Sequence, residues 1–293
     1  MVTGQPMPAE GPARPLQVRR VSARDRAATL AYLRRDVRGN LLLIDLVRRM
    51  GEPPPPGEEA AELLGAWRAG ELVGVAAIRP AVLFDAGLAA EALVRFAPHV
   101  ARLSAGLAKG RADRVATLWA WLAARGARAL LDRAETACVV GPAEFKPAQP
   151  PADARLRDAT SGDLEDLVYA ARASLAEEGR PDPYEGDPQG FRRWVRGRIP
   201  RARVAEVDGR VGFVGYADVR CREGWLLQGV YTWRDRRRRG LAKAGISDLC
   251  EAAFHAGANH VQLSVVDGNL PAQRLYEGLG FRPHTQLRTI LFT

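Results

Sequence analysis

This 293-residue sequence contains only three lysines and three cysteines, and it has no long apolar run. The cysteines, Cys138, Cys221 and Cys250, are far apart and lack metal-ligand spacing, which argues against a disulfide scaffold and against a metal site. No stretch approaches the roughly 20 apolar residues that a membrane-spanning helix needs, and residues 1–15 lack the apolar core of a signal peptide. We therefore expect a cytoplasmic protein with no membrane partner.

Positive charge is abundant, and arginine supplies nearly all of it. The formal net charge is +9, and all but three of the 43 basic residues are arginine. Arginine spread along a chain rich in Ala, Gly and Pro is typical of a codon bias. The charge favours anionic ligands but does not by itself identify a nucleic acid as the partner.

A proline-rich segment divides the chain into two halves. Residues 147–153, Pro-Ala-Gln-Pro-Pro-Ala-Asp, cannot sustain a helix or a central strand. We expect a flexible tail at 1–15, a first domain at 16–146, this linker, and a second domain at 154–293.

The second half alternates strand and helix patterns, which predicts an α/β domain with a mixed sheet. Asp208-Gly209 between two apolar runs is a hairpin signal. A strand, a loop, a helix and a further strand follow one another after Gly224, so the strands at 225–232 and 261–266 should run parallel. The predicted strands are 155–159, 203–207, 211–219, 225–232, 261–266 and 286–293, and the predicted helices are 162–178, 191–198, 240–256 and 270–279.

The segment Arg237–Lys243 lies between the apolar strand and the amphipathic helix that follows it. A helix N-terminus offers unpaired N–H groups and a partial positive charge, so it attracts an anion. Gly240 and the small Ala242 allow backbone to approach a ligand closely, and arginines add charge-assisted contacts to phosphate. A solvated basic loop or a nucleic-acid patch would show the same arginines, but the position between strand and helix favours a pyrophosphate site.

Two motifs connect the second half to a known family. Arg-x-x-Gly-x-Ala at 237–242 resembles the pyrophosphate loop of the GNAT superfamily of acyl-CoA N-acyltransferases. The segment 269–281 is similar to a second pattern of that family, Asn-x-x-Ala-x-x-Leu-Tyr-x-x-x-Gly-Phe, and matches it at every specified position. Arg234 and Arg238 depart from the proline and glycine that are common there, and both changes add charge. The resemblance covers about residues 155–293.

The resemblance implies an enzyme that transfers an acyl group from acetyl-CoA to an amine by direct attack. Val230, Tyr231 and Thr232 would bond the pantetheine arm through their backbones, and Asn269 would line the cofactor cleft. Tyr276 would protonate or hydrogen-bond the leaving thiolate, the alternative being a core tyrosine. The residues implied to hold the pyrophosphate are Arg237, Arg238, Arg239, Gly240, Leu241, Ala242 and Lys243.

The sequence leaves the general base and the acceptor unassigned. Family members often use a carboxylate on the strand at 225–232, where this chain has Gln228. For each remaining candidate the sequence favours a solvated surface carboxylate over a base; these candidates are Glu206, Glu223, Glu177 and Glu178.

The first half repeats the second faintly. Trp67–Val75 resembles the hairpin of the second half, and Gly106–Lys109 repeats the letters of 240–243, with Leu103 in the place of Arg237. We therefore expect two GNAT-like mixed-sheet domains, of which the N-terminal one is degenerate. It would shape the acceptor site or form the interface of a homodimer.

Two alternatives to an N-acetyltransferase stay open. A non-catalytic acyl-CoA sensor would keep the cofactor loop without a working base. A nucleic-acid-binding protein would use Arg234–Arg239 as a basic patch, and the setting of the loop favours it less.

Overall fold

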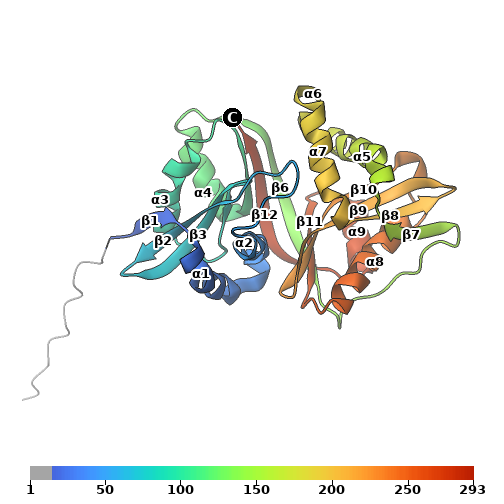
Figure 1. The fold of residues 1–293 in the computed structure, drawn as a ribbon, viewed down its shortest axis with the longest axis horizontal. Helices are drawn as coiled ribbons and strands as arrows, with labels where there is room; N and C mark the ends of the chain where they lie inside the picture. The colour runs from blue at the N-terminus through green and yellow to red at the C-terminus, as the bar shows by residue number, and fades with distance from the viewer. Residues whose placement is uncertain (1–14) are drawn as a thin grey trace, which may run out of the picture.

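The computed structural model describes residues 15–293, and the tail expected at 1–15 lies outside them apart from Pro15. Each half of the chain forms a lobe, and α2 (Val37–Arg48) lies between the two lobes (Figure 1). The long strands β6 (Ala129–Val140) and β12 (Arg282–Phe292) run through the middle of the molecule. Among the described residues, no helix combines the length and apolarity needed to cross a bilayer.

The first half is itself an α/β unit. Its helices carry one apolar face each, and these faces pack on the strands to form a core centred on Phe96 and Leu118. Its remaining elements are β1 (Gln17–Arg20), α1 (Arg26–Leu33), β2 (Glu62–Arg68), β3 (Glu71–Arg79), β4 (Leu83–Phe84), α3 (Ala90–Val100), β5 (Gly106–Arg111) and α4 (Ala112–Ala123).

The second half follows the predicted order of strands and helices. Its elements are β7 (Ala154–Asp158), α5 (Leu164–Glu177), α6 (Pro183–Gly186), α7 (Pro188–Arg198), β8 (Ala202–Val207), β9 (Arg210–Cys221), β10 (Gly224–Thr232), α8 (Leu241–His255), β11 (Val261–Val266), α9 (Leu270–Gly278) and the long β12. Asp208 and Gly209 both have positive φ, as a tight hairpin turn requires. The parallel pairing predicted for the strands at 225–232 and 261–266 is confirmed by β10 and β11.

The two halves share one sheet. The described residues form a four-stranded sheet in the order β1-β2-β3-β4 and an eight-stranded sheet in the order β5-β12-β6-β11-β10-β9-β8-β7. The last strand of the first half, β6, pairs with β11 of the second half, and β12 pairs with β5 of the first half. The strands β6 and β12 also pair with each other. Each half therefore supplies its last strand to the other.

The cores confirm this exchange of strands. Cys138 and Val140 of β6 belong to the buried apolar cluster of the second half. Ile290 and Phe292 of β12 belong to that of the first half, and both are almost fully buried. The last strand was predicted to begin at Gln286; it begins at Arg282 and completes the first half.

The proposed match between Gly106–Lys109 and residues 240–243 is wrong. Residues 106–111 form the strand β5, in which Lys109 pairs with Thr289 of β12, whereas 240–243 opens a helix. In element order the counterpart of α8 is α3, so the loop that corresponds to the arginine loop is 85–89, and Leu103 lies beyond α3. Four small or flexible residues adopt either structure, because partner strands rather than local preference decide the outcome.

Packing between the lobes is both apolar and ionic. Leu41 of α2 is buried against Val219 and Leu226 of the second half. At the same face Glu223 accepts hydrogen bonds from Arg34 and Arg48, at 2.6 and 2.8 Å. Although burial opposes it, these arginines help to lower the pKa of Glu223 to about 2. The helix α2 thus anchors the first lobe to the sheet of the second.

Candidate active site

The parallel strands β10 and β11 separate along their length. They pair only at Trp225–Val261 and Leu226–Gln262, near their N-terminal ends. A bulge follows in β10 between Gln228 and Tyr231, and Gly229 within it has a φ of 58°. The bulge turns β10 away from β11, so a gap opens toward the carboxyl ends of both strands.

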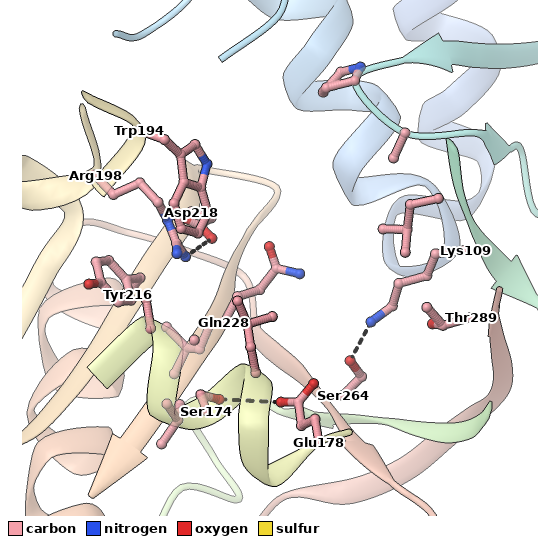
Figure 2. A pocket seen from close by; sticks show the side chains of 18 of the residues that line it. Lys109, Ser174, Glu178, Trp194, Arg198, Tyr216, Asp218, Gln228, Ser264 and Thr289 are labelled. Atoms are coloured by element: carbon pink, nitrogen blue, oxygen red, sulfur yellow. Dashed lines mark hydrogen bonds and ion pairs between the residues drawn. The ribbon is translucent and has the colours of Figure 1, made fainter. Parts of the chain in front are cut away.

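A cavity of about 960 Å³ occupies this gap and continues between the two lobes (Figure 2). Leu227–Val230 line it from β10, and Leu263–Val266 line it from β11. Asn269 and Tyr276 contribute from the α9 side, and Lys109 reaches it from the first half. A space of this size is typical of a small-molecule site, and polar side chains from several elements converge on it.

The arginine loop ends at an open helix N-terminus. Gly240 has a φ of 80°, a conformation that favours glycine, and it is the N-cap of α8. The first helical hydrogen bond is donated by Ala244 N to Gly240 O, at 3.0 Å. The amides of Leu241, Ala242 and Lys243 precede it and have no partner inside the helix. This geometry suits an anion, as the spacing of the loop predicts.

Most arginines of the loop are paired with carboxylates. Arg234 and Arg237 both contact Glu177, and Arg239 contacts Asp153. Partial burial opposes it, but the two arginines at Glu177 lower the pKa of that carboxyl. Arg238 has positive φ and no ion pair within residues 15–293. The loop is therefore less positive than its sequence suggests.

The backbone of Val230–Thr232 lies along the open side of β10. Tyr231 and Thr232 pair with β9 on their other edge, and no β11 residue pairs with them. The carbonyl of Thr232 accepts a hydrogen bond from Arg237 Nε at 3.1 Å. Val230 lines the cavity. The free edge offers the backbone groups that an extended ligand needs for strand-like hydrogen bonds.

Asn269 and Tyr276 lie on α9, where the second motif predicts a helix. Asn269 is the N-cap of α9, and its Oδ1 accepts a hydrogen bond from Ala272 N at 3.2 Å. The ring of Tyr276 packs against Phe281 with 5.8 Å between centroids. Burial raises the pKa of Tyr276 to about 12. Its phenol is therefore neutral at physiological pH, and Tyr276 lies at once in the core and on the cavity wall.

The four carboxylates considered for the base, and Gln228 in the place where family members often have one, lie in different places. Gln228 and Glu178 line the cavity. Glu206 is paired with Arg157, and Glu223 holds α2 as described above. Glu177 points to the arginine loop instead of the cavity. Of the candidate carboxylates, Glu178 is the one on the wall.

A second group of polar side chains faces Glu178 across the cavity (Figure 2). Arg198 of α7 donates to Asp218 of β9 at 2.6 Å, and its guanidinium lies 3.9 Å from the centre of the Tyr216 ring and 4.8 Å from that of Trp194. Burial raises the pKa of Tyr216 to about 12. Sequence reasoning missed this group, because its members come from separate elements and follow no motif.

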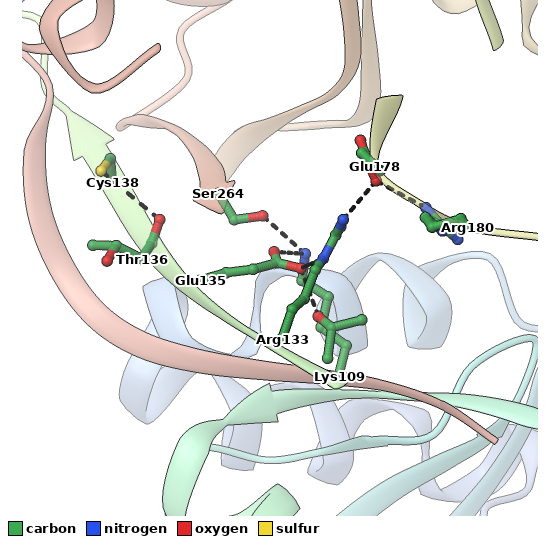
Figure 3. A network of polar contacts seen from close by, with 9 residues as sticks. Lys109, Arg133, Glu135, Thr136, Cys138, Glu178, Arg180 and Ser264 are labelled. Carbon is green, nitrogen blue, oxygen red and sulfur yellow. Dashed lines mark hydrogen bonds and ion pairs between the residues drawn. The ribbon is translucent and has the colours of Figure 1, made fainter. Parts of the chain in front are cut away.

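A polar network closes the side of the cavity next to the first half (Figure 3). Lys109 Nζ donates to Glu135 at 2.6 Å and to Ser264 Oγ at 2.8 Å. Arg133 bridges Glu135 and Glu178, at 2.8 and 2.6 Å. The network spans four neighbouring strands and both halves. Nowhere in residues 15–293 do three or more His, Cys, Asp or Glu side chains form a group that could hold a metal ion.

Within residues 15–146, the first half has no loop of arginines before a helix comparable to that of the second half. The loop before α3 carries Asp85, which is 1% exposed and accepts hydrogen bonds from the amides of Val75 and Gly87. A carboxylate thus lies in the loop where the second half carries arginines, and its negative charge would repel a phosphate. The first half fits the description of a degenerate unit.

Comparison with known proteins identifies the second half. The model of the Acetyltransferase (GNAT) family matches residues 165–281. Residues 165–281, within the second half of the chain, are therefore a GNAT acyltransferase domain. A search of the curated proteins found no match to the sequence.

Solved structures share the GNAT fold over both halves. A tandem GNAT protein from the clavulanic acid biosynthesis pathway has a TM-score of 0.57 at 16% identity, covering 95% of this chain and 98% of that one. A GCN5-related N-acetyltransferase from Sphaerobacter thermophilus has a TM-score of 0.57 at 15% identity, covering 96% of each chain. A Drosophila protein reaches a TM-score of 0.72 at 11% identity, covering 94% and 98%. The prediction of two GNAT-like mixed-sheet halves is confirmed.

Proposed function

We propose that this protein is an N-acetyltransferase that transfers the acetyl group of acetyl-CoA to an amine by direct attack. The observation that carries the proposal is the gap between β10 and β11, which holds the cavity and opens toward the end of β10 from which the chain runs to the N-terminus of α8. A long ligand with an anionic end and an extended arm fits such a site. Coenzyme A has this chemistry.

The loop Arg237–Lys243 would hold the pyrophosphate. The free amides at the start of α8 support this assignment, since they donate hydrogen bonds and carry the positive end of the helix dipole. Arg238 lacks an ion pair within the described residues, so it can turn to a phosphate without losing a partner. The open backbone edge of Val230–Thr232 would bond the pantetheine arm, with Asn269 beside it.

Tyr276 would stabilise the leaving thiolate. In the proposed reaction the amine nitrogen forms a bond to the acyl carbon, the carbon–sulfur bond breaks, and the sulfur leaves with the electron pair. A phenol with a pKa of about 12 is a weaker acid than an ordinary thiol, whose pKa is about 8.5. The role that fits Tyr276 is therefore a hydrogen-bond donor to sulfur throughout the reaction, and full proton transfer from it is uphill.

The acceptor would enter from the cavity between the lobes. Glu178 would act as the general base and accept the proton of the attacking amine. It lies on the cavity wall and accepts a hydrogen bond from Arg133 at 2.6 Å. The group of Arg198, Asp218 and Tyr216 would bind the remainder of the acceptor. The first half would contribute Arg133, which holds Glu178, and this gives it a function without its own cofactor.

A matched pair of variants tests the cofactor site. Asn and Asp have the same size and both tolerate the positive φ of Gly240, so Gly240→Asn measures backbone strain and Gly240→Asp adds a negative charge. Calorimetry with acetyl-CoA should give affinities for the wild type and Gly240→Asn within a few fold. Gly240→Asp should bind about tenfold or more weakly than Gly240→Asn. Equal affinities of the two variants would show that this loop does not bind the pyrophosphate.

Release of free thiol from acetyl-CoA with a panel of amines tests the reaction. Turnover with any amine supports the transferase, whereas tight binding without turnover across the panel supports an acyl-CoA sensor. The nucleic-acid alternative predicts strongly salt-dependent DNA or RNA binding that coenzyme A does not displace. The ion pairs of Arg234, Arg237 and Arg239 argue against a free basic patch.

A further inference from the structure

The first half places one ammonium group on the wall of the cavity, in contact with β11 of the second half. Lys109 lies on β5, and its Nζ donates to Ser264 Oγ of β11 at 2.8 Å (Figures 2 and 3). The contact depends on the exchanged strands, because in the order β5-β12-β6-β11 only β12 and β6 separate β5 from β11 within one sheet. A chain of two separate sheets would keep them apart.

The ammonium is held in place from behind. Glu135 is 2% exposed and accepts hydrogen bonds from Lys109, Arg133 and Thr289, at 2.6, 2.8 and 2.7 Å. Burial alone would raise the pKa of this carboxyl, but the neighbouring cations and the Thr289 hydroxyl lower it to about 2. The Glu135 carboxylate therefore fixes the Lys109 side chain and leaves two further N–H donors, one of which goes to Ser264.

The direction of the Lys109–Ser264 hydrogen bond determines what Ser264 can do next. An ammonium group only donates, so Ser264 Oγ accepts. A hydroxyl has a single proton, and within residues 15–293 the proton of Ser264 finds no acceptor. Ser264 lines the cavity, on the same face of β11 as Gln262 and Val266. Its proton is thus available to a ligand in the cavity.

Ser264 lies near the closed end of the gap between β10 and β11. The last residue of β11 that pairs with β10 is Gln262, and Ser264 is the next residue on the same face of β11. The arginine loop follows the carboxyl end of β10, at the open end. A donor that binds its pyrophosphate at Gly240 and runs inward therefore brings its acyl group, rather than its pantetheine amides, to the level of Ser264.

We infer that Ser264 donates a hydrogen bond to the acyl carbonyl oxygen of the bound donor, and that Lys109 is a positioning residue that acts through Ser264. This inference rests on the proposed function. It assigns the first half a direct part in the chemistry of the second. A hydroxyl that receives a hydrogen bond from an ammonium becomes a stronger donor, which suits an oxygen that gains negative charge during attack.

The affinities of acetyl-CoA and free coenzyme A, measured by calorimetry on the full chain, test the inference without an acceptor. The two ligands differ in the acyl carbonyl. Ser264→Ala should weaken acetyl-CoA about fivefold to tenfold relative to coenzyme A, the effect of one lost hydrogen bond. Ser104→Ala, an exposed serine before β5, is the control and should leave the ratio unchanged. Equal weakening of both ligands, or no change, would overturn the inference.

Lys109 is tested in the same ratio. The single variant Lys109→Met leaves the buried Glu135 carboxylate with one neighbouring cation fewer. A double variant, Lys109→Met with Glu135→Gln, is therefore made as well, because it removes both charges. Thermal melting first checks that both variants are folded. Each should then shift the ratio of the acetyl-CoA and coenzyme A affinities in the same direction as Ser264→Ala. Neither should shift this ratio further when residue 264 is already alanine. Additive effects would mean that Lys109 does not act through Ser264. Lys146→Met is the control for loss of one exposed lysine.

These outcomes separate the inference from the function on which it rests. A wild type that binds both ligands, with an unchanged ratio in every variant, overturns the role of Ser264 and Lys109 alone. A wild type that binds neither ligand overturns the proposed function and the inference together.

Discussion

Arg237 Nη2 donates to both carboxylate oxygens of Glu177, at 2.8 and 2.7 Å. Glu177 is the last residue of α5, and it also accepts from Arg234 Nε at 2.8 Å. The carboxylate therefore occupies the guanidinium group of Arg237, which the proposed pyrophosphate would contact, and that of the neighbouring Arg234. Its neighbour Glu178 points into the acceptor cavity, so the end of α5 joins the two halves of the site.

Glu177→Gln should strengthen coenzyme A binding. Loss of the carboxylate charge frees Arg234 and Arg237 for the pyrophosphate, and the site loses a negative charge that repels it. We expect the Kd in calorimetry to fall about threefold to tenfold, with a steeper dependence on salt. The control is Glu165→Gln, which lies on α5 like Glu177 and removes the ion pair with Arg192 of α7. Weaker binding by Glu177→Gln would show that Glu177 positions the arginines rather than competing for them.

Glu178→Gln should affect the reaction and spare the cofactor. The amide keeps the shape of the side chain but cannot take a proton from the acceptor amine. With an acceptor found by thiol release, turnover should fall about 100-fold while the affinity for acetyl-CoA stays within a few fold. Normal turnover of Glu178→Gln would show that Glu178 is not the general base.

Tyr276→Phe should lower turnover about 100-fold, the usual cost of one donor to a developing charge. Phenylalanine retains the packing against Phe281, so the melting temperature should change little. The raised pKa, about 12, keeps the phenol protonated, and the wild-type rate should show no loss from Tyr276 ionisation up to pH about 10. If the rate of the variant stays within a few fold of the wild type, Tyr276 serves packing alone.

The elements of the second half could be predicted from sequence, because local signals mark them. The hairpin at Asp208-Gly209, the cap at Asn269 and the left-handed Gly240 all follow from chemistry within a few residues. The exchange of β6 and β12 could not be predicted, since either strand presents the same apolar pattern to its own half and to the other. The cavity residues Arg198, Asp218 and Lys109 were missed for the same reason, because long-range pairing brings them together.

The acid stability of the protein should depend on Glu135. Its pKa is lowered from 4.5 to about 2 in the folded state, so its stabilising contribution is present at neutral pH and is lost as the pH falls from about 4.5 to 2. The contribution is roughly 3 kcal/mol at most. Urea unfolding at pH 7 and pH 3 should show a smaller difference for Glu135→Gln than for the wild type. Equal differences would mean that other carboxylates control the acid transition.

The halves should fold only together. A fragment of residues 154–293 lacks β6, which leaves an edge of β11 and the core around Leu263 uncovered. We expect it to aggregate, as should residues 15–146, which lack β12. Expression of both fragments in one cell should restore a folded complex that binds acetyl-CoA. A folded, cofactor-binding 154–293 fragment would contradict this dependence on the exchanged strand.

The exchange of strands also sets an order of events during synthesis. The first half is complete in sequence once β6 has left the ribosome, yet its core still waits for Ile290 and Phe292 of β12. During this interval β5 keeps an unpaired edge while about 140 further residues are translated. A chaperone that shields exposed strand edges can act between the synthesis of β6 and that of β12. The translation speed across the second half determines how long this interval lasts.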